Sequence, residues 1–101
     1  MMRQSKRTEV FAAVLSDDIV RLRKAVAEGG DCNLRDELGV TPLYYAITRG
    51  HADVVGALLD CGADIELSPS ADDPFTSPLM LAENEWGLDE VGALLRSRGA
   101  M

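Results

Sequence analysis

The chain has 101 residues, of which 47% are hydrophobic and five are aromatic, so it can form one domain with a modest core and is not generally disordered. Its net charge is −7, and residues 31–101 carry thirteen acidic against four basic side chains, a net −9. This charge repels nucleic-acid phosphates and attracts a basic partner, although the same excess is also common on surfaces that are simply solvated.

The chain begins with a basic segment, residues 1–7, that we expect to be a tail. The segment TEVFAAVLSDD follows it and starts the first of three similar units. When this unit is aligned with the central one at an offset of 33 residues, Ala13 falls on Ala46 and Gly29 on Gly62. The first unit lacks the Thr-Pro start of the central unit and is more polar, which suits the end of a stack.

The central unit predicts two short helices. Thr41 can cap the first helix, and Pro42 suits its first position because the missing N–H of proline costs nothing there. Gly50 supplies the left-handed conformation that ends this helix. A second helix is expected over Ala52–Asp60, with Gly62 as its stop. Apolar residues recur at helical spacing, namely Leu43, Ala46 and Ile47 in the first helix and Val54, Val55, Leu58 and Leu59 in the second.

The third unit repeats the central one at an offset of 36 residues. The pentapeptide VGALL occurs at Val55–Leu59 and again at Val91–Leu95, and Pro42 falls on Pro78. The connection ELSPSADDPFTSPL has three extra residues and is rich in Ser, Asp and Pro, so we expect a longer or irregular loop. Because a short helix pair cannot bury both of its faces alone, stacked copies would share one core. VGALL is therefore interpreted as a buried helix face.

The string DELGVTPLYYAITRGHADVVGALLDCGADIE resembles an ankyrin repeat, whose pattern is D-x-x-G-x-T-P-L-H-x-A followed by G-H, V-V, L-L and G-A-D. The resemblance implies an all-α repeat solenoid of three ankyrin-like helix-turn-helix units with short β-hairpin finger loops. The domain would span residues 8–100, with repeats at about 8–40, 41–73 and 74–101. Tyr44 and Met80 stand where the pattern has histidine, so the hydrogen bonds of that histidine are not expected here.

In ankyrin repeat proteins, finger tips and the exposed side of each first helix usually form the binding surface. The resemblance therefore implies a protein–protein interaction module that performs no catalysis. We interpret Leu38, Val40 and Tyr45 as an apolar groove beside acidic residues, with the alternative that Val40 and Tyr45 only cover the core. Trp86 is interpreted either as a binding residue or as a cover for the open end of the stack. The predicted partner-binding residues are Glu37, Leu38, Val40, Tyr45, Thr48, Arg49, Asp73, Pro74, Thr76, Asn84, Glu85 and Trp86.

The chain has many carboxylates but no recognisable arrangement of catalytic residues. His51 is the only histidine, and we expect it to bond the local backbone at a helix start. Cys61 lies ten residues further along, which on a helix means a separation of roughly 15 Å, too far for a catalytic pair. The acidic residues occur as neighbours rather than at the spacing of metal ligands. We therefore expect no enzyme activity, no metal and no cofactor.

Cys32 and Cys61 stand apart, and no apolar segment follows the basic N-terminus, so we expect a reducing, cytoplasmic location. No apolar run reaches the length of a membrane span. The expected partner is another protein, basic in one hypothesis, and the expected state is a monomer, with a homo-oligomer left open. An alternative function is that of an inhibitor or immunity-type protein which occludes a basic enzyme.

Overall fold

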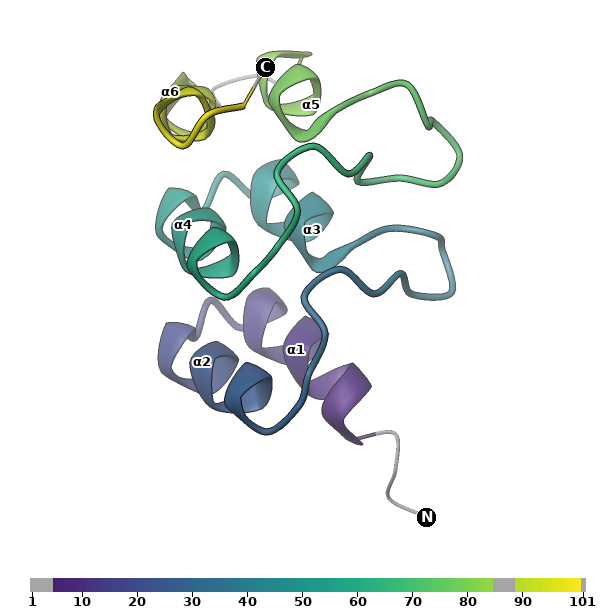
Figure 1. Cartoon of the computed structure of the whole chain (residues 1–101), viewed down its shortest axis with the longest axis vertical. Helices are drawn as coiled ribbons and strands as arrows, with labels where there is room; N and C mark the ends of the chain where they lie inside the picture. The colour runs from purple at the N-terminus through teal and green to yellow at the C-terminus, as the bar shows by residue number, and fades with distance from the viewer. Residues whose placement is uncertain (1–4, 85–88, 101) are drawn as a thin grey trace.

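The computed structural model describes residues 5–84 and 89–100. Within these residues the chain forms three pairs of short helices (Figure 1). The first helix begins at Ser5. This is three residues before Thr8, where we expected the domain to begin. The helices are α1 (Ser5–Leu15), α2 (Ile19–Ala27), α3 (Pro42–Thr48), α4 (Ala52–Asp60), α5 (Pro78–Asn84) and α6 (Asp89–Ser97).

The three pairs stack on one another to form two rows of helices. One row consists of α1, α3 and α5 and the other of α2, α4 and α6, and each helix contacts its neighbour in the row and its partner in the pair (Figure 1). The loops that join successive pairs project beyond the α1–α3–α5 row (Figure 1). This arrangement confirms the predicted all-α repeat solenoid. None of the described helices is long and apolar enough to cross a membrane.

The caps of the first helices follow from the sequence. The Thr41 hydroxyl accepts a hydrogen bond from the Tyr44 N–H at 3.4 Å, and Pro42 occupies the first turn of α3. Ser77 caps α5 in the same way by accepting from the Met80 N–H at 3.2 Å. The predicted bounds of α4, Ala52–Asp60, are those of the structure. The local signals in the central repeat were therefore sufficient to place its helices.

The core lies between the two rows and runs through all three repeats. Both copies of VGALL contribute to it, since Val55 and Val91 are almost completely buried. The buried leucine differs between the copies, because Leu58 is fully buried in α4 whereas Leu95 is the fully buried one in α6. The interpretation of VGALL as a buried helix face is confirmed.

The loops differ from the expected β-hairpins. Within the described residues they contain no ladder of strand hydrogen bonds, and the one bridge, Val40 to Ser70, joins two different loops. In the first loop the Asp36 N–H donates to the Val40 carbonyl at 3.0 Å, but the Val40 N–H donates to the Asp36 carboxylate at 3.2 Å. Because the side chain takes the place of a backbone acceptor, the hairpin pairing does not continue.

The two ends of the stack carry matching ion pairs. Arg21 of α2 pairs with Glu9 of α1, and Arg96 of α6 pairs with Glu83 of α5. In the central repeat, the positions that align with Arg21 and Glu83 are the buried apolar residues Val54 and Ile47. Polar pairs thus finish the terminal repeats, whereas the central repeat is apolar at both positions.

Candidate functional site

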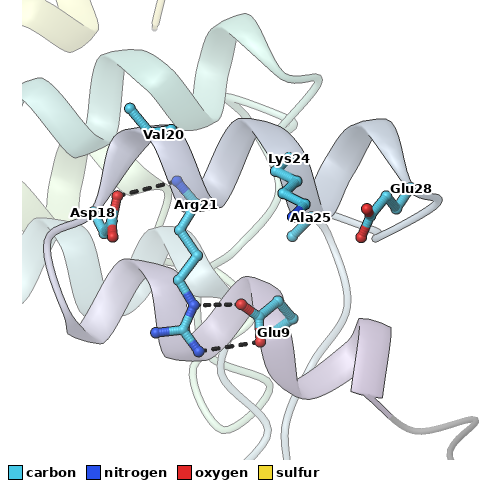
Figure 2. A pocket seen from close by; sticks show the side chains of 7 residues that line it. All are labelled: Glu9, Asp18, Val20, Arg21, Lys24, Ala25 and Glu28. Atoms are coloured by element: carbon cyan, nitrogen blue, oxygen red, sulfur yellow. Dashed lines mark hydrogen bonds and ion pairs between the residues drawn. The ribbon is translucent and has the colours of Figure 1, made fainter.

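A shallow hollow lies on the outer surface of α1 and α2, with a volume of about 460 Å³ (Figure 2). Figure 2 shows the Arg21 guanidinium reaching across it to the Glu9 carboxylate. The hydrogen bond from Arg21 lowers the pKa of Glu9, so this acid is held ionised and is a poor proton donor. The best-placed acid of this hollow is therefore engaged in an ion pair with Arg21. The lining of the hollow consists of Glu9, Asp18, Val20, Arg21, Lys24, Ala25 and Glu28.

His51 occupies the position just before α4, but its side chain makes no capping hydrogen bond. The expectation that it bonds the local backbone is therefore wrong. Its Nδ1 atom lies 3.5 Å from the Asp17 carboxylate of the first repeat, a close approach that does not meet hydrogen-bond geometry. Asp17 is held there by a left-handed backbone conformation with φ of 56°. His51 thus faces the neighbouring repeat and not a nucleophile.

Both cysteines are free thiols in the structure. Cys32 is 4% exposed, and its Sγ lies 3.7 Å from the Cys61 carbonyl oxygen. Burial, with smaller contributions from Cys61 and Asp31, raises the pKa of Cys32 to about 11. A thiol in that environment is protonated and a weak nucleophile. Among the described residues there is also no group of three or more His, Cys, Asp or Glu side chains placed to hold a metal ion.

The loop of residues 34–40, named here the first finger, is organised by Asp36. The Asp36 carboxylate accepts hydrogen bonds from the N–H groups of Leu38 at 2.9 Å and Val40 at 3.2 Å. Gly39 closes the turn with φ of 81°, a conformation that favours glycine. The tip of the first finger therefore has a fixed shape, with Glu37 and Leu38 exposed on it. Leu38 is 72% exposed.

The loop of residues 66–77, named here the second finger, contains the three extra residues. Ser68 closes it, since its hydroxyl lies 3.0 Å from the Ser70 carbonyl oxygen and 2.7 Å from that of Asp73. The Thr76 hydroxyl donates to the Asp73 carboxylate at 2.6 Å. These bonds give the longer loop a defined course, and Phe75 projects from it with 90% of its surface exposed.

The two fingers are joined to each other. The Ala71 N–H donates to the Gly39 carbonyl at 2.8 Å, and the Thr41 N–H donates to the Pro69 carbonyl at 2.9 Å. Arg35 adds a side-chain connection, because its guanidinium donates to the carbonyls of Gly39 at 3.0 Å and Ser68 at 2.9 Å. The fingers therefore present one continuous surface beside the α1–α3–α5 row (Figure 1).

Tyr45 connects this surface to the helices. Its hydroxyl donates to the Asp36 carboxylate, and its ring meets Phe11 and Tyr44 edge to face at centroid distances of 6.0 and 5.7 Å. The hydrogen bond to Asp36, together with burial, raises the pKa of Tyr45 to about 12. Partial burial alone would raise the pKa of Asp36, but the hydrogen bonds from Tyr45, Val40 and Leu38 outweigh it and lower that pKa. Asp36 is thus ionised and structural.

The predicted binding residues fall into three groups. Val40 is a correction: it is only 6% exposed and its backbone pairs with Ser70 of the next finger, so it is not an exposed part of an apolar groove. Thr48 is half-buried and its hydroxyl donates to the Tyr44 carbonyl at 2.9 Å within α3. Glu85 and Trp86 lie outside the described residues. The others are exposed (Glu37, Leu38, Arg49, Asp73, Pro74 and Asn84) or half-buried (Tyr45 and Thr76).

Phe75 was not among the predicted binding residues, although it lies in the lengthened loop that the sequence singled out. It is the most exposed of the large apolar residues that the structure describes, and it lies between the predicted Pro74 and Thr76. The available signal was its position: it is the one aromatic residue in the turn-rich second finger, outside any apolar stripe of a helix. An aromatic residue outside the helical stripes is not expected to pack in the core.

Comparison with known proteins identifies the class. The family model described as ankyrin repeats (3 copies) matches residues 10–100, so the chain belongs to the ankyrin repeat family. It is 40% identical to human ankyrin repeat domain-containing protein 63 over 80 residues, which cover 75% of this chain and 20% of that protein. It is also 40% identical to human protein phosphatase 1 regulatory subunit 27 over 52 residues, 52% of this chain and 34% of that protein.

A third similarity involves an enzyme. The chain is 38% identical to mouse 2-5A-dependent ribonuclease over 58 residues, which cover 56% of this chain but 8% of the ribonuclease. The chain thus spans about a third or less of the length of these three relatives. What is shared with them is the repeat, and ankyrin repeats are protein–protein interaction modules.

Proposed function

We propose that the protein is a binding module that holds another protein against its fingers and the adjoining α1–α3–α5 row, and that it performs no catalysis. The observation that carries this proposal is the surface formed by the two joined fingers. Leu38 and Phe75 are exposed on it at 72% and 90%, although the chain has a core in which apolar residues are buried. Each of the two joined fingers thus offers one large apolar side chain that a partner could cover.

The mechanism is passive recognition by a surface that is already in its bound shape. Arg35, Asp36 and Ser68 fix the course of the fingers before any partner arrives. A partner therefore loses little free energy to ordering the loops, and more of the contact energy appears as affinity. Tyr45 supports the same surface from α3 through its bond to Asp36.

An inhibitor that occludes a basic enzyme is the second candidate function. It is supported by the net −9 of residues 31–101, which would speed the encounter with a basic surface. A relative of this chain is named as a regulatory subunit of a phosphatase, which is a precedent for an ankyrin repeat protein acting on an enzyme. The proposed state is a monomer in the cytoplasm, in keeping with two free cysteines and with end surfaces closed by ion pairs.

The test is position-resolved cross-linking in the native cell. A photo-reactive p-benzoylphenylalanine is placed at Leu38 in one variant and at Val20 in another, since both side chains are exposed but Val20 lies on α2. A partner that cross-links from position 38 and not from position 20 supports the proposal. Equal products from both positions, or none from position 38, contradict it. Adding the purified protein to a captured enzyme then separates inhibition from simple binding.

A further inference from the structure

We propose that the partner segment bound by the fingers is basic and carries apolar side chains between its Lys and Arg residues. This inference rests on the proposed function and assigns a chemistry to the ligand. Leu38 and Phe75 would be the apolar anchors, and Glu37, Asp72 and Asp73 the acidic contacts. All five residues are exposed on the two fingers.

The apolar part of the inference comes from where the exposed residues lie. One large apolar side chain stands on each finger, Leu38 on the first and Phe75 on the second. The Ala71–Gly39 and Thr41–Pro69 hydrogen bonds join the two loops, so both side chains project from connected backbone. Two exposed apolar groups on joined loops match a partner that offers apolar side chains of its own.

The charge of the fingers supplies the second part. Together they contain five acidic residues and one basic residue, Arg35. The guanidinium of Arg35 is directed at the carbonyls of Gly39 and Ser68, so its donors are used within the fingers. Asp36 is likewise engaged by backbone N–H groups and Tyr45. The carboxylates that remain at the exposed surface include Glu37, Asp72 and Asp73.

This charge selects among possible occupants. A second copy of the chain would bring the same acidic fingers, and nucleic acids and anionic lipid surfaces carry charge of the same sign. A basic protein segment is attracted, and its apolar residues can cover Leu38 and Phe75 at the same time. Burial of the apolar groups would contribute affinity, and the opposite charges would speed the encounter.

The probe is a display library of random peptides of about 16 residues, long enough to cross both fingers. The library is selected against the whole chain, and the composition of the enriched pool is compared with that of the input. We expect enrichment of Lys and Arg together with Leu, Ile, Phe or Trp. Individual peptides are then synthesised and their affinities are measured by fluorescence anisotropy.

Three variants locate the binding. The double variant L38S/F75S should weaken the selected peptides about tenfold or more. The variant E37Q/D72N should weaken them severalfold and reduce the fall in affinity between about 50 mM and about 500 mM NaCl. Val20→Ser is the matched control, since Val20 is 78% exposed on α2 and should leave the affinity unchanged. All substituted side chains are exposed, and circular dichroism verifies that each variant is folded.

The outcomes separate this inference from the proposed function. Peptides that lose affinity with L38S/F75S but are acidic, or are basic without apolar residues, overturn the inference and leave the finger surface standing. Peptides that bind L38S/F75S as well as the unchanged chain, or an absence of enrichment, overturn both. Dimerisation in size-exclusion chromatography that L38S/F75S abolishes would also overturn the inference, because a second copy would then cover the tips.

Discussion

Tyr45 in the first helix of the central repeat donates its phenolic hydrogen to the carboxylate of Asp36, nine residues earlier in the first finger. The same carboxylate accepts the N–H groups of Leu38 and Val40. One acidic side chain therefore fixes the shape of the finger and attaches it to α3. The surface proposed to bind a partner depends on this pair, although neither side chain needs to touch the partner.

The Asp36–Tyr45 pair predicts a titration. In a Tyr44→Phe background Tyr45 is the sole tyrosine, and its pKa of about 12 should fall toward 10 when Asp36 is changed to Asn, because the hydrogen bond to a charged acceptor is lost. Absorbance at alkaline pH measures this shift. Since the folded-state pKa is raised, the contribution of Tyr45 to stability is present below pH 10 and is lost as the pH rises toward 12. An unchanged pKa in the Asp36→Asn variant would contradict the pairing.

Arg35 is predicted to hold the two fingers together. Arg35→Met removes the bonds to the Gly39 and Ser68 carbonyls, and we expect a loss of about 1–2 kcal/mol in the free energy of unfolding. Hydrogen exchange of the Ala71 N–H, which donates to Gly39, should speed up in the same variant. Arg49→Met is the control, because Arg49 is an exposed residue that caps α3 through its backbone. Equal effects of the two substitutions would argue against the connection.

The two thiols are predicted to react at different rates. With the pKa of Cys32 raised from 9.0 to about 11, chiefly by burial, its thiolate fraction at neutral pH falls about a hundredfold. A maleimide should therefore modify Cys61 first, and in a Cys61→Ala variant the remaining thiol should react slowly until urea unfolds the chain. Mass spectrometry at successive times follows the reaction. Rapid modification of folded Cys61→Ala would contradict the burial of Cys32.

Gly30 is predicted to tolerate no side chain. A Cβ atom there would lie 2.7 Å from the Val10 Cγ2 atom and 2.9 Å from the Ala25 carbonyl oxygen. Because backbone atoms cannot give way cheaply, Gly30→Ala should cost about 1–3 kcal/mol in the free energy of unfolding. Urea denaturation measures the loss. A neutral substitution would mean that the turn after α2 can shift away from α1.

Gly56 in the VGALL segment of α4 is predicted to behave in the opposite way. A Cβ atom there would have ordinary contacts, 3.6 Å from Leu94 and 3.6 Å from Arg98. Alanine is the better helix former, so Gly56→Ala should stabilise the chain by about 0.5–1 kcal/mol. The same urea titration that tests Gly30 tests this variant. Destabilisation would show that α4 and α6 pack more closely than these contacts indicate.

The fold was largely predictable from the sequence because its signals are local. Thr41, Pro42 and Gly50 mark the start and end of α3 within ten residues of one another, and the apolar stripe of α4 lies in a single helix. The three repeats also support one another, because helices predicted in one repeat are expected at the aligned positions of the next. The stack needed only these elements and a shared core.

The surface was less predictable because it depends on contacts between repeats. Val40 is buried where its backbone pairs with Ser70, thirty residues later, and no pattern around Val40 signals that pairing. His51 approaches Asp17 of the preceding repeat for a similar reason. Phe75 was not listed because the predicted binding residues were carried over from matching positions of the ankyrin pattern. The extra residues of the second finger shift the loop relative to that pattern. Exposure in the fingers is a property of two loops together.

The ion pairs at the two ends also determine how this domain can change in length. Arg21–Glu9 and Arg96–Glu83 put charge where a further repeat would need an apolar face. The central repeat instead has Val54 and Ile47 buried at those positions. Duplication of the central repeat would therefore extend the stack, whereas a copy appended at either end would cover an ion pair with an apolar face. Each such duplication would add one finger, and with it one more apolar tip. The length of the binding surface would therefore depend on how many central repeats the domain contains.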